Sequence, residues 1–138
     1  MKVHKSFNFS GPSVKPANLW DGEPIPSRAV VYSWGYDASN MTVKILGKKT
    51  LDIIPESSCR KEITDFNINY GICASPSMMC GADKGSGLYI RDTNNKSILI
   101  GLASYPVRCG YTNPQKMANY IKLVGSLQNW IAITIATN

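Results

Sequence analysis

The sequence predicts an all-β domain, an antiparallel barrel or sandwich, that ends in a single helix. Short runs rich in β-branched and aromatic residues recur along the chain, separated by Gly, Pro, Asn or Asp. Runs spaced in this way are typical of antiparallel barrels and sandwiches. Only the last stretch, residues 124–136, places its apolar residues at helical spacing. The expected strands are residues 28–34, 42–54, 70–74, 87–91, 98–104 and 117–121.

The first 27 residues are expected to form an extended strap rather than regular structure. Proline has no backbone N–H to give to a helix or a central strand, and four prolines occur here, at positions 12, 16, 24 and 26. We therefore divide the chain into a strap at residues 1–27 and a barrel at residues 28–138.

Two helices and one hairpin loop complete the expected elements. Residues 57–63 can form a short helix with Ser57 or Ser58 as its N-cap. Residues 92–96, Asp-Thr-Asn-Asn-Lys, form a good hairpin loop because Asp and Asn tolerate left-handed backbone. The C-terminal helix is expected to be amphipathic, with apolar residues at Val124, Leu127, Trp130, Ile131 and Ile135.

Composition and charge exclude several classes of protein. With 138 residues, 43% apolar and 17% charged, the chain is of the globular type. No apolar run reaches the roughly 20 residues of a membrane span. Fifteen Lys and Arg against nine Asp and Glu give a charge of +6, which would suit a sulfated glycan such as heparin. The basic residues are scattered and form no stripe, so we expect no nucleic-acid partner.

The four cysteines form an even set, compatible with two disulfides or with a four-ligand metal site: Cys59, Cys73, Cys80 and Cys109. No Cys-x-x-Cys pair is present, and the single histidine, His4, lies far from the cysteines in the sequence, so we expect no metal. Disulfides indicate an oxidising compartment.

Three Asn-x-Ser/Thr sequons, at Asn8, Asn40 and Asn95, agree with secretion and are candidate glycosylation sites. The first residues lack the apolar core of a signal peptide. Either the chain stays inside the cell, or it is secreted and its true N-terminus is missing from this sequence. We expect the second.

Read in order, segments of the chain resemble the C-terminal barrel of trypsin-like (chymotrypsin-family) serine proteases. Val-Tyr-Ser-Trp-Gly resembles the family's SGWG strand, and residues 80–87 stand where the family has its nucleophile motif. The resemblance covers nearly the whole chain. It implies a six-stranded Greek-key barrel with a C-terminal helix, and the pairing of Cys59 with Cys73 and of Cys80 with Cys109. The matching segments are residues 14–19, 31–35, 51–55, 72–74, 80–87, 100–105 and 129–131.

The resemblance places Lys84, in place of serine, at the nucleophile position, directly after Asp83. A protonated lysine cannot replace a seryl oxygen without a new base. Asp83 resembles the family aspartate that pairs with a new N-terminus after activation, and Lys84 is its alternative partner here. Ala82 replaces a glycine of the oxyanion hole. A register shifted by two residues would instead make Ser86 the nucleophile.

The family's catalytic His and Asp come from the other half of the domain, and the His4 segment does not correspond to either. By resemblance, the floor of the substrate pocket is Met78 with Met79, and its wall is Ser104, Tyr105 and Pro106. Proline at position 106 has no N–H with which to bind a substrate backbone. A pocket with this floor would accept apolar groups or be filled by the methionines.

Three functions are compatible with these residues. The first is a secreted, non-catalytic serine protease homologue that acts by protein binding, as a decoy, cofactor or regulator of a protease cascade. The alternative is a trypsin-family endopeptidase whose N-terminal half, with His and Asp, is supplied outside this chain. The third is a polyanion-binding module that uses the net positive charge. The expected partner is a protein, either the missing N-terminal barrel or a protease or inhibitor, and no cofactor or membrane is expected.

Overall fold

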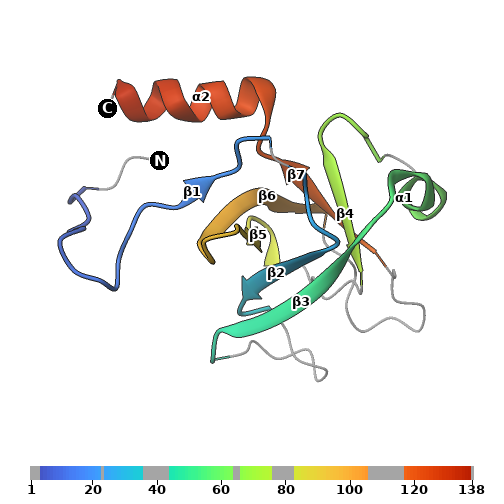
Figure 1. Ribbon diagram of the computed structural model, residues 1–138, viewed down its shortest axis with the longest axis horizontal. Coiled ribbons are helices and arrows are strands. Elements are labelled where there is room, and N and C mark those ends of the chain that lie inside the picture. Colours follow the sequence, from blue (N-terminus) through green and yellow to red (C-terminus); the bar gives the residue numbers. More distant parts are fainter. Residues whose placement is uncertain are drawn as a thin grey trace.

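A closed antiparallel barrel forms the body of the protein (Figure 1). The computed structural model describes residues 4–22, 24–35, 44–63, 66–75, 83–105 and 117–137. The elements within them are β1 (Asn18–Leu19), β2 (Arg28–Ser33), β3 (Gly47–Ile54), α1 (Glu56–Glu62), β4 (Gly71–Ser75), β5 (Gly87–Arg91), β6 (Ser97–Tyr105), β7 (Ala118–Lys122) and α2 (Gly125–Ala136).

Six antiparallel strands make the ring. Their order is β6-β5-β2-β3-β4-β7, and pairing of β6 with β7 closes it. β1 lies outside the ring and pairs with β6 in parallel. The expected six-stranded barrel with a C-terminal helix is therefore confirmed, and the sandwich is excluded.

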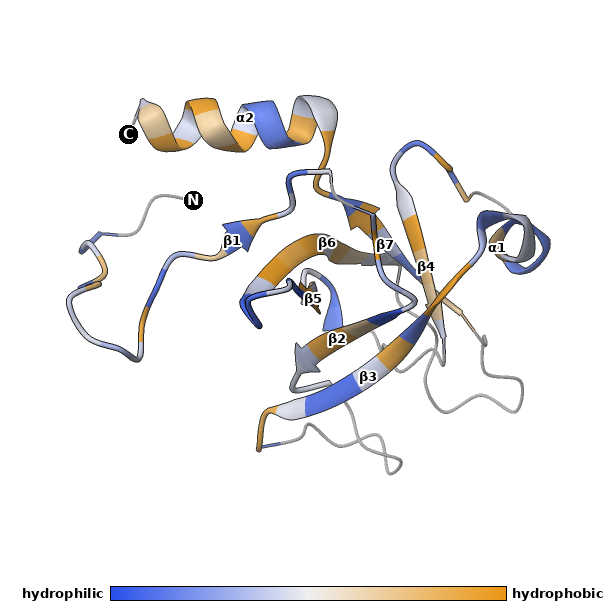
Figure 2. Ribbon diagram, viewed as in Figure 1, coloured by the Kyte–Doolittle hydropathy of each residue, from blue (hydrophilic) through white to orange (hydrophobic). Residues whose placement is uncertain are grey.

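The core follows from the two-residue period of the strands, because alternate side chains point into the barrel. In β2 the inward positions are Ala29 and Val31, and in β7 they are Ala118 and Tyr120. Figure 2 shows apolar residues along the barrel strands. The strap contributes as well, because Trp20 is buried. The buried cluster comprises Trp20, Ala29, Val31, Leu51, Ile72, Ala74, Leu88, Ile90, Ile100, Ala103, Ala118 and Tyr120.

Strand β3 is shorter than expected at its start. The sequence predicts a strand from residue 42, whereas β3 begins at Gly47. Its partner β2 ends at Ser33, directly opposite Gly47, so the residues before Gly47 have no strand to pair with. Residues 44–46 are exposed outside the sheet, and residues 42 and 43 lie outside the described part of the chain.

The short helix α1 is confirmed, but its expected cap is wrong. Pro55 occupies the N-cap position, and neither Ser57 nor Ser58 caps the helix with its side chain. The Pro55 carbonyl accepts hydrogen bonds from the backbone N–H groups of Ser58 (3.0 Å) and Cys59 (3.2 Å). The helix therefore starts at Glu56, one residue before the expected start at residue 57. Glu56 places a negative charge in the first turn, where the helix dipole favours it.

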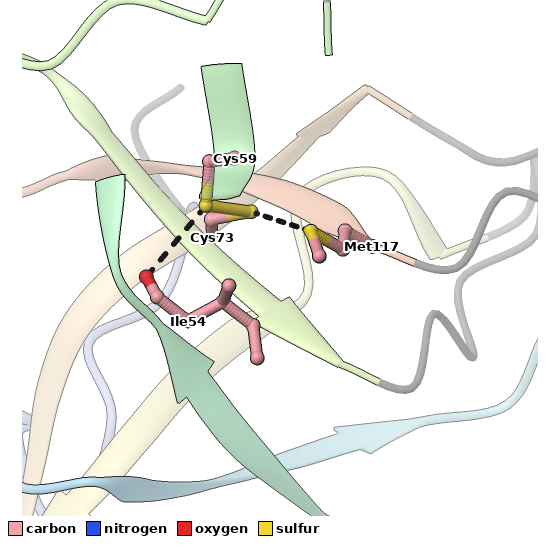
Figure 3. Close-up of a disulfide and its surroundings, with 4 residues drawn as sticks. All are labelled: Ile54, Cys59, Cys73 and Met117. Carbon is pink, nitrogen blue, oxygen red and sulfur yellow. Dashed lines mark hydrogen bonds between the residues drawn. A yellow bond between two sulfur atoms is a disulfide. The ribbon is translucent and has the colours of Figure 1, made fainter. Parts of the chain in front are cut away.

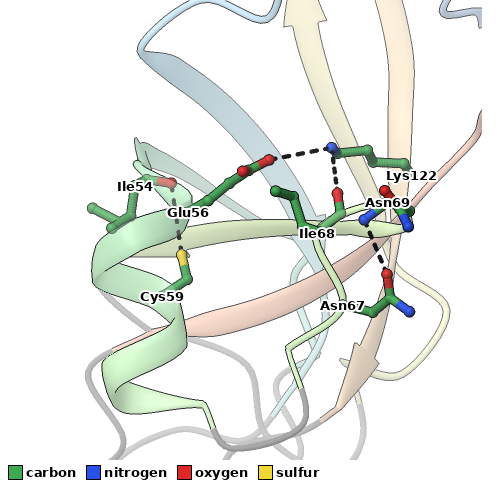
Figure 4. Close-up of polar contacts among 7 residues, drawn as sticks. All are labelled: Ile54, Glu56, Cys59, Asn67, Ile68, Asn69 and Lys122. Atoms are coloured by element: carbon green, nitrogen blue, oxygen red, sulfur yellow. Dashed lines mark hydrogen bonds and ion pairs between the residues drawn. The ribbon is translucent and has the colours of Figure 1, made fainter.

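A disulfide and a lysine hold α1 against the barrel. Cys59 of α1 bonds to Cys73 of β4 (Figure 3), which confirms the pairing implied by the family resemblance. The Cys73 sulfur also lies 3.6 Å from the sulfur of Met117; this is a packing contact, because a disulfide sulfur carries no hydrogen to donate. Lys122 of β7 donates to the Ile68 carbonyl (3.0 Å) and lies 3.9 Å from the Glu56 carboxylate (Figure 4).

The hairpin between β5 and β6 is confirmed at the expected loop. The Asp92 carboxylate accepts hydrogen bonds from the backbone N–H groups of Asn94 (2.9 Å) and Lys96 (2.7 Å). Asn95 adopts left-handed backbone with φ of 61°. Asp and Asn are therefore used here in the way that their turn preferences predict.

Helix α2 is confirmed as a helix, but the barrel does not bury its apolar face. No residue of α2 is buried, and Trp130 and Ile135 are 62% and 73% exposed. Figure 1 shows the helix extending away from the barrel, on the side of β1. A side-chain hydrogen bond ties its first half to the strap, from Gln128 Nε2 to the Trp20 carbonyl (2.7 Å). Within the described residues, no helix is long and apolar enough to cross a membrane.

Candidate functional site

The loop at residues 83–87 carries the residues that the sequence singled out for chemistry. Two hydrogen bonds fix it against β6: Gly85 N–H donates to the Ala103 carbonyl, and Ala103 N–H donates to the Ser86 carbonyl, both at 2.9 Å. Within the loop, Ser86 N–H donates to the Asp83 carbonyl (3.0 Å). The loop therefore lies beside Ala103 of β6, the residue directly before Ser104 and Tyr105 of the expected pocket wall.

Asp83 and Lys84 point into different environments. The Asp83 side chain is buried, whereas Lys84 is exposed to solvent. Among the described residues, no ion pair joins Lys84 to Asp83.

Gly35 packs directly on the Asp83 carboxylate. Its backbone is left-handed, with φ of 34°, and a Cβ built there would lie 2.8 Å from both carboxylate oxygens. Real Cβ atoms essentially never make such a contact. The end of the Val-Tyr-Ser-Trp-Gly segment and the loop at 83–87 are thus brought together, although 48 residues separate Gly35 from Asp83 in the sequence.

Tyr120 is the polar core residue that sequence reasoning missed. It is fully buried, and its hydroxyl has no hydrogen-bond partner in the part of the chain that the structure describes. Burial raises the pKa of Tyr120 above its ordinary value, and the negative charge of Asp83 adds to the rise. The two-residue period of a strand could have identified it: Tyr120 stands two residues after Ala118, so both side chains lie on the inward face of β7.

The structure describes some of the other candidate residues. Ser86 and Ser104 are half-buried, and Tyr105 is the last residue of β6. Asn8 and Asn95, the first and third sequons, are exposed. Several candidates lie outside the described residues: Met78, Met79, Cys80, Ala82, Pro106, Cys109 and Asn40. The pairing of Cys80 with Cys109 and the pocket floor therefore stay predictions.

The hydroxyl considered as an alternative nucleophile in this loop is that of Ser86. Nucleophilic catalysis by a hydroxyl requires a base within hydrogen-bond reach. No described hydrogen bond joins Ser86 to a base, and His4 is exposed in the strap. The same residues contain no group of three or more His, Cys, Asp or Glu side chains that could hold a metal ion.

Comparison with known proteins gives the family. The trypsin family model matches residues 1–131. The chain is also 32% identical, over 115 residues, to the venom peptide isomerase heavy chain of Agelenopsis aperta. That match covers 75% of this chain and 46% of the relative, so the chain spans less than half the length of this relative. The matched residues include the barrel, the Cys59–Cys73 disulfide, the loop at 83–87 and the first half of α2, and the chain belongs to the trypsin family.

Proposed function

We propose that this chain is part of a secreted, non-catalytic member of the trypsin family that acts by binding another protein, as a cofactor, decoy or regulator in a protease cascade. The observation that carries the proposal is Lys84. The family resemblance puts it at the nucleophile position, and its side chain is exposed at the surface of the loop that β6 holds in place.

The environment of Lys84 argues against a change of nucleophile. A lysine becomes nucleophilic only after it loses its proton, and proteins achieve this by desolvating the amine or by placing another cation beside it. Lys84 is exposed, so it is not desolvated. Ser86, two residues later, has its backbone N–H and carbonyl engaged by Asp83 and Ala103, which supports its role as a structural turn residue.

Helix α2 supports the binding part of the proposal. It carries no charged residue, and Trp130, Ile133 and Ile135 are exposed on it. Exposed apolar surface of this kind marks protein-interaction sites. We assign this face to the complementary half of a trypsin-type domain, in the same longer polypeptide or in a second one. The coverage of 46% of the relative supports an assembly larger than these 138 residues.

A fluorophosphonate probe tests the absence of catalysis. Such probes label the activated serine of a serine protease. We expect no label on the native protein purified in its complete, processed form, with trypsin labelled in parallel as the positive control. Label on the native protein that a Ser86→Ala variant abolishes would establish the endopeptidase alternative and overturn the proposal.

Oxidative footprinting tests the docking face, because the chain contains a matched pair of tryptophans. Trp34 and Trp130 are 60% and 62% exposed, so hydroxyl radicals should oxidise them at similar rates in the isolated chain. In the native assembly we expect Trp130 to be protected relative to Trp34, and cross-links from α2 to reach a trypsin-type sequence. Equal oxidation of the two residues in the native assembly would refute the assignment of α2.

A further inference from the structure

We propose that Asn95, at the tip of the β5–β6 hairpin, carries an N-linked glycan. Asn95-Lys96-Ser97 is a sequon with no proline at its middle position, as the modification requires. The inference rests on secretion, which is part of the proposed function, but it does not depend on what binds α2 or on the absence of catalysis.

The hairpin presents Asn95 to solvent. Asn95 and the three other loop residues from 93 to 96 are all exposed. The side-chain amide of Asn95 makes no hydrogen bond in the described part of the chain. An attached oligosaccharide therefore displaces no contact of the folded protein.

The loop keeps its shape without the Asn95 side chain. The Asp92 carboxylate holds two backbone N–H groups of the loop, and Asn95 N–H donates to the Asp92 carbonyl (2.9 Å). Arg91 Nη1 donates to the backbone carbonyl of Asn95 at 2.7 Å. All of these bonds use the Asn95 backbone or other residues, so modification of its amide nitrogen leaves the hairpin intact.

Asn8 is the other sequon asparagine among the described residues. It is exposed too, and its side-chain oxygen accepts hydrogen bonds from both the backbone N–H and the hydroxyl of Ser10. These bonds use the oxygen and not the amide nitrogen, which is the atom that carries a glycan. Asn95 lies in a defined turn with its amide directed to no partner. What distinguishes Asn95 is its place in a hairpin loop whose hydrogen bonds do not use its side chain.

The transfer reaction balances with one co-reactant, a lipid-pyrophosphate-linked oligosaccharide of the secretory pathway. The amide nitrogen of Asn95 attacks the anomeric carbon of the first sugar, and a C–N bond forms. The C–O bond to the pyrophosphate breaks, the lipid pyrophosphate leaves with the bonding electrons, and the amide loses one proton. No oxidation or reduction takes place.

Peptide mapping of the native protein is the first test. A peptide amidase that removes N-glycans converts each occupied asparagine to aspartate, so we expect position 95 to be read as aspartate after digestion. An unmodified asparagine at position 95, with and without digestion, would overturn the proposal.

Matched variants of the full chain, secreted from eukaryotic cells, test the assignment independently of the source. We expect Asn95→Asp and Ser97→Ala each to lose one glycan, while Ser97→Thr, which preserves the sequon, and Asn8→Asp keep the glycan at position 95. Aspartate tolerates left-handed backbone, so Asn95→Asp should secrete and fold as the parent does. The same glycan content in Asn95→Asp as in the parent would refute the site.

Discussion

Substitution of Gly35 by alanine should destabilise the protein through two separable effects. Backbone at φ of 34° is strained for any residue with a Cβ. The new Cβ would also lie 2.8 Å from each oxygen of the Asp83 carboxylate, which is buried and cannot move into open space. The contact is therefore relieved by rotation of the buried Asp83 side chain away from its position, or by a shift of the backbone near Gly35.

The size of each effect can be estimated. Left-handed backbone costs a non-glycine residue about 1–2 kcal/mol. Extra volume in a well-packed interior costs about 1–3 kcal/mol. Gly35→Ala should therefore lower the free energy of unfolding by about 2–5 kcal/mol, the sum of the two.

Gly85→Ala is the matched control. Gly85 lies in the same loop region with φ of 82°, and nothing lies within 4 Å of the position that its Cβ would take. It should show the backbone effect alone, about 1–2 kcal/mol. Gly11→Ala has open space and no left-handed backbone, so it should leave stability unchanged.

Urea denaturation followed by tryptophan fluorescence measures all three variants. With an ordinary slope of about 1–3 kcal/mol per molar urea, Gly35→Ala should lower the midpoint of unfolding by about 0.7 M or more. If Gly35→Ala and Gly85→Ala lose the same stability, the packing of Gly35 on Asp83 does not constrain the fold and the reasoning is refuted.

Three further predictions concern the core, the disulfide and the hairpin. Tyr120→Phe removes a buried hydroxyl without a described partner, so at pH 7 it should keep or raise stability, by about 1 kcal/mol in urea denaturation; a loss above 1 kcal/mol would contradict this. The pKa of Tyr120 is raised in the fold, so above about pH 10 the phenol ionises in the unfolded chain before it ionises in the folded one. Unfolding then releases a proton, and the stability of the parent should fall more steeply with rising pH than that of Tyr120→Phe. A double alanine variant of Cys59 and Cys73, which are 14 residues apart, should lose about 3 kcal/mol under non-reducing conditions, and an unchanged urea midpoint would argue against the disulfide. Asp92→Ala removes two hydrogen bonds to the loop backbone and should cost about 1–3 kcal/mol, with faster amide exchange at Asn94 and Lys96 as the local readout.

Local patterns in the sequence predict most of the barrel. The alternation in β2 and β7 identifies the inward residues, and the hairpin loop at 92–96 follows from its Asp and Asn residues. These features depend on neighbours within a few residues, which a single sequence displays. The start of β3 depends instead on where its partner β2 ends, at Ser33, and the sequence of β3 itself contains no sign of that limit.

The candidate site is harder to predict because its contacts are not local. The contact between Gly35 and Asp83, and the influence of Asp83 on Tyr120, join three separate strands or loops. Sequence reasoning found Asp83 through the family motif but had no local reason to connect it with Tyr120. Likewise, the spacing of apolar residues predicts that α2 is a helix, but spacing does not identify the surface that covers Trp130.

The short strand β1 has a consequence for aggregation. In the first half of β6, one edge of the strand pairs with β5. The other edge pairs with β7 only from Gly101 onward, so the residues of β6 before Gly101 have no partner strand of the ring on that edge. Asn18 and Leu19 pair with Ile98 and Leu99 there, and Trp20 N–H donates to the Leu99 carbonyl (3.1 Å). Unpaired edges are templates for pairing between chains. The strap therefore covers the exposed edge of β6 and blocks pairing with a second chain there. A protein without residues 1–27 should form intermolecular β-structure through β6.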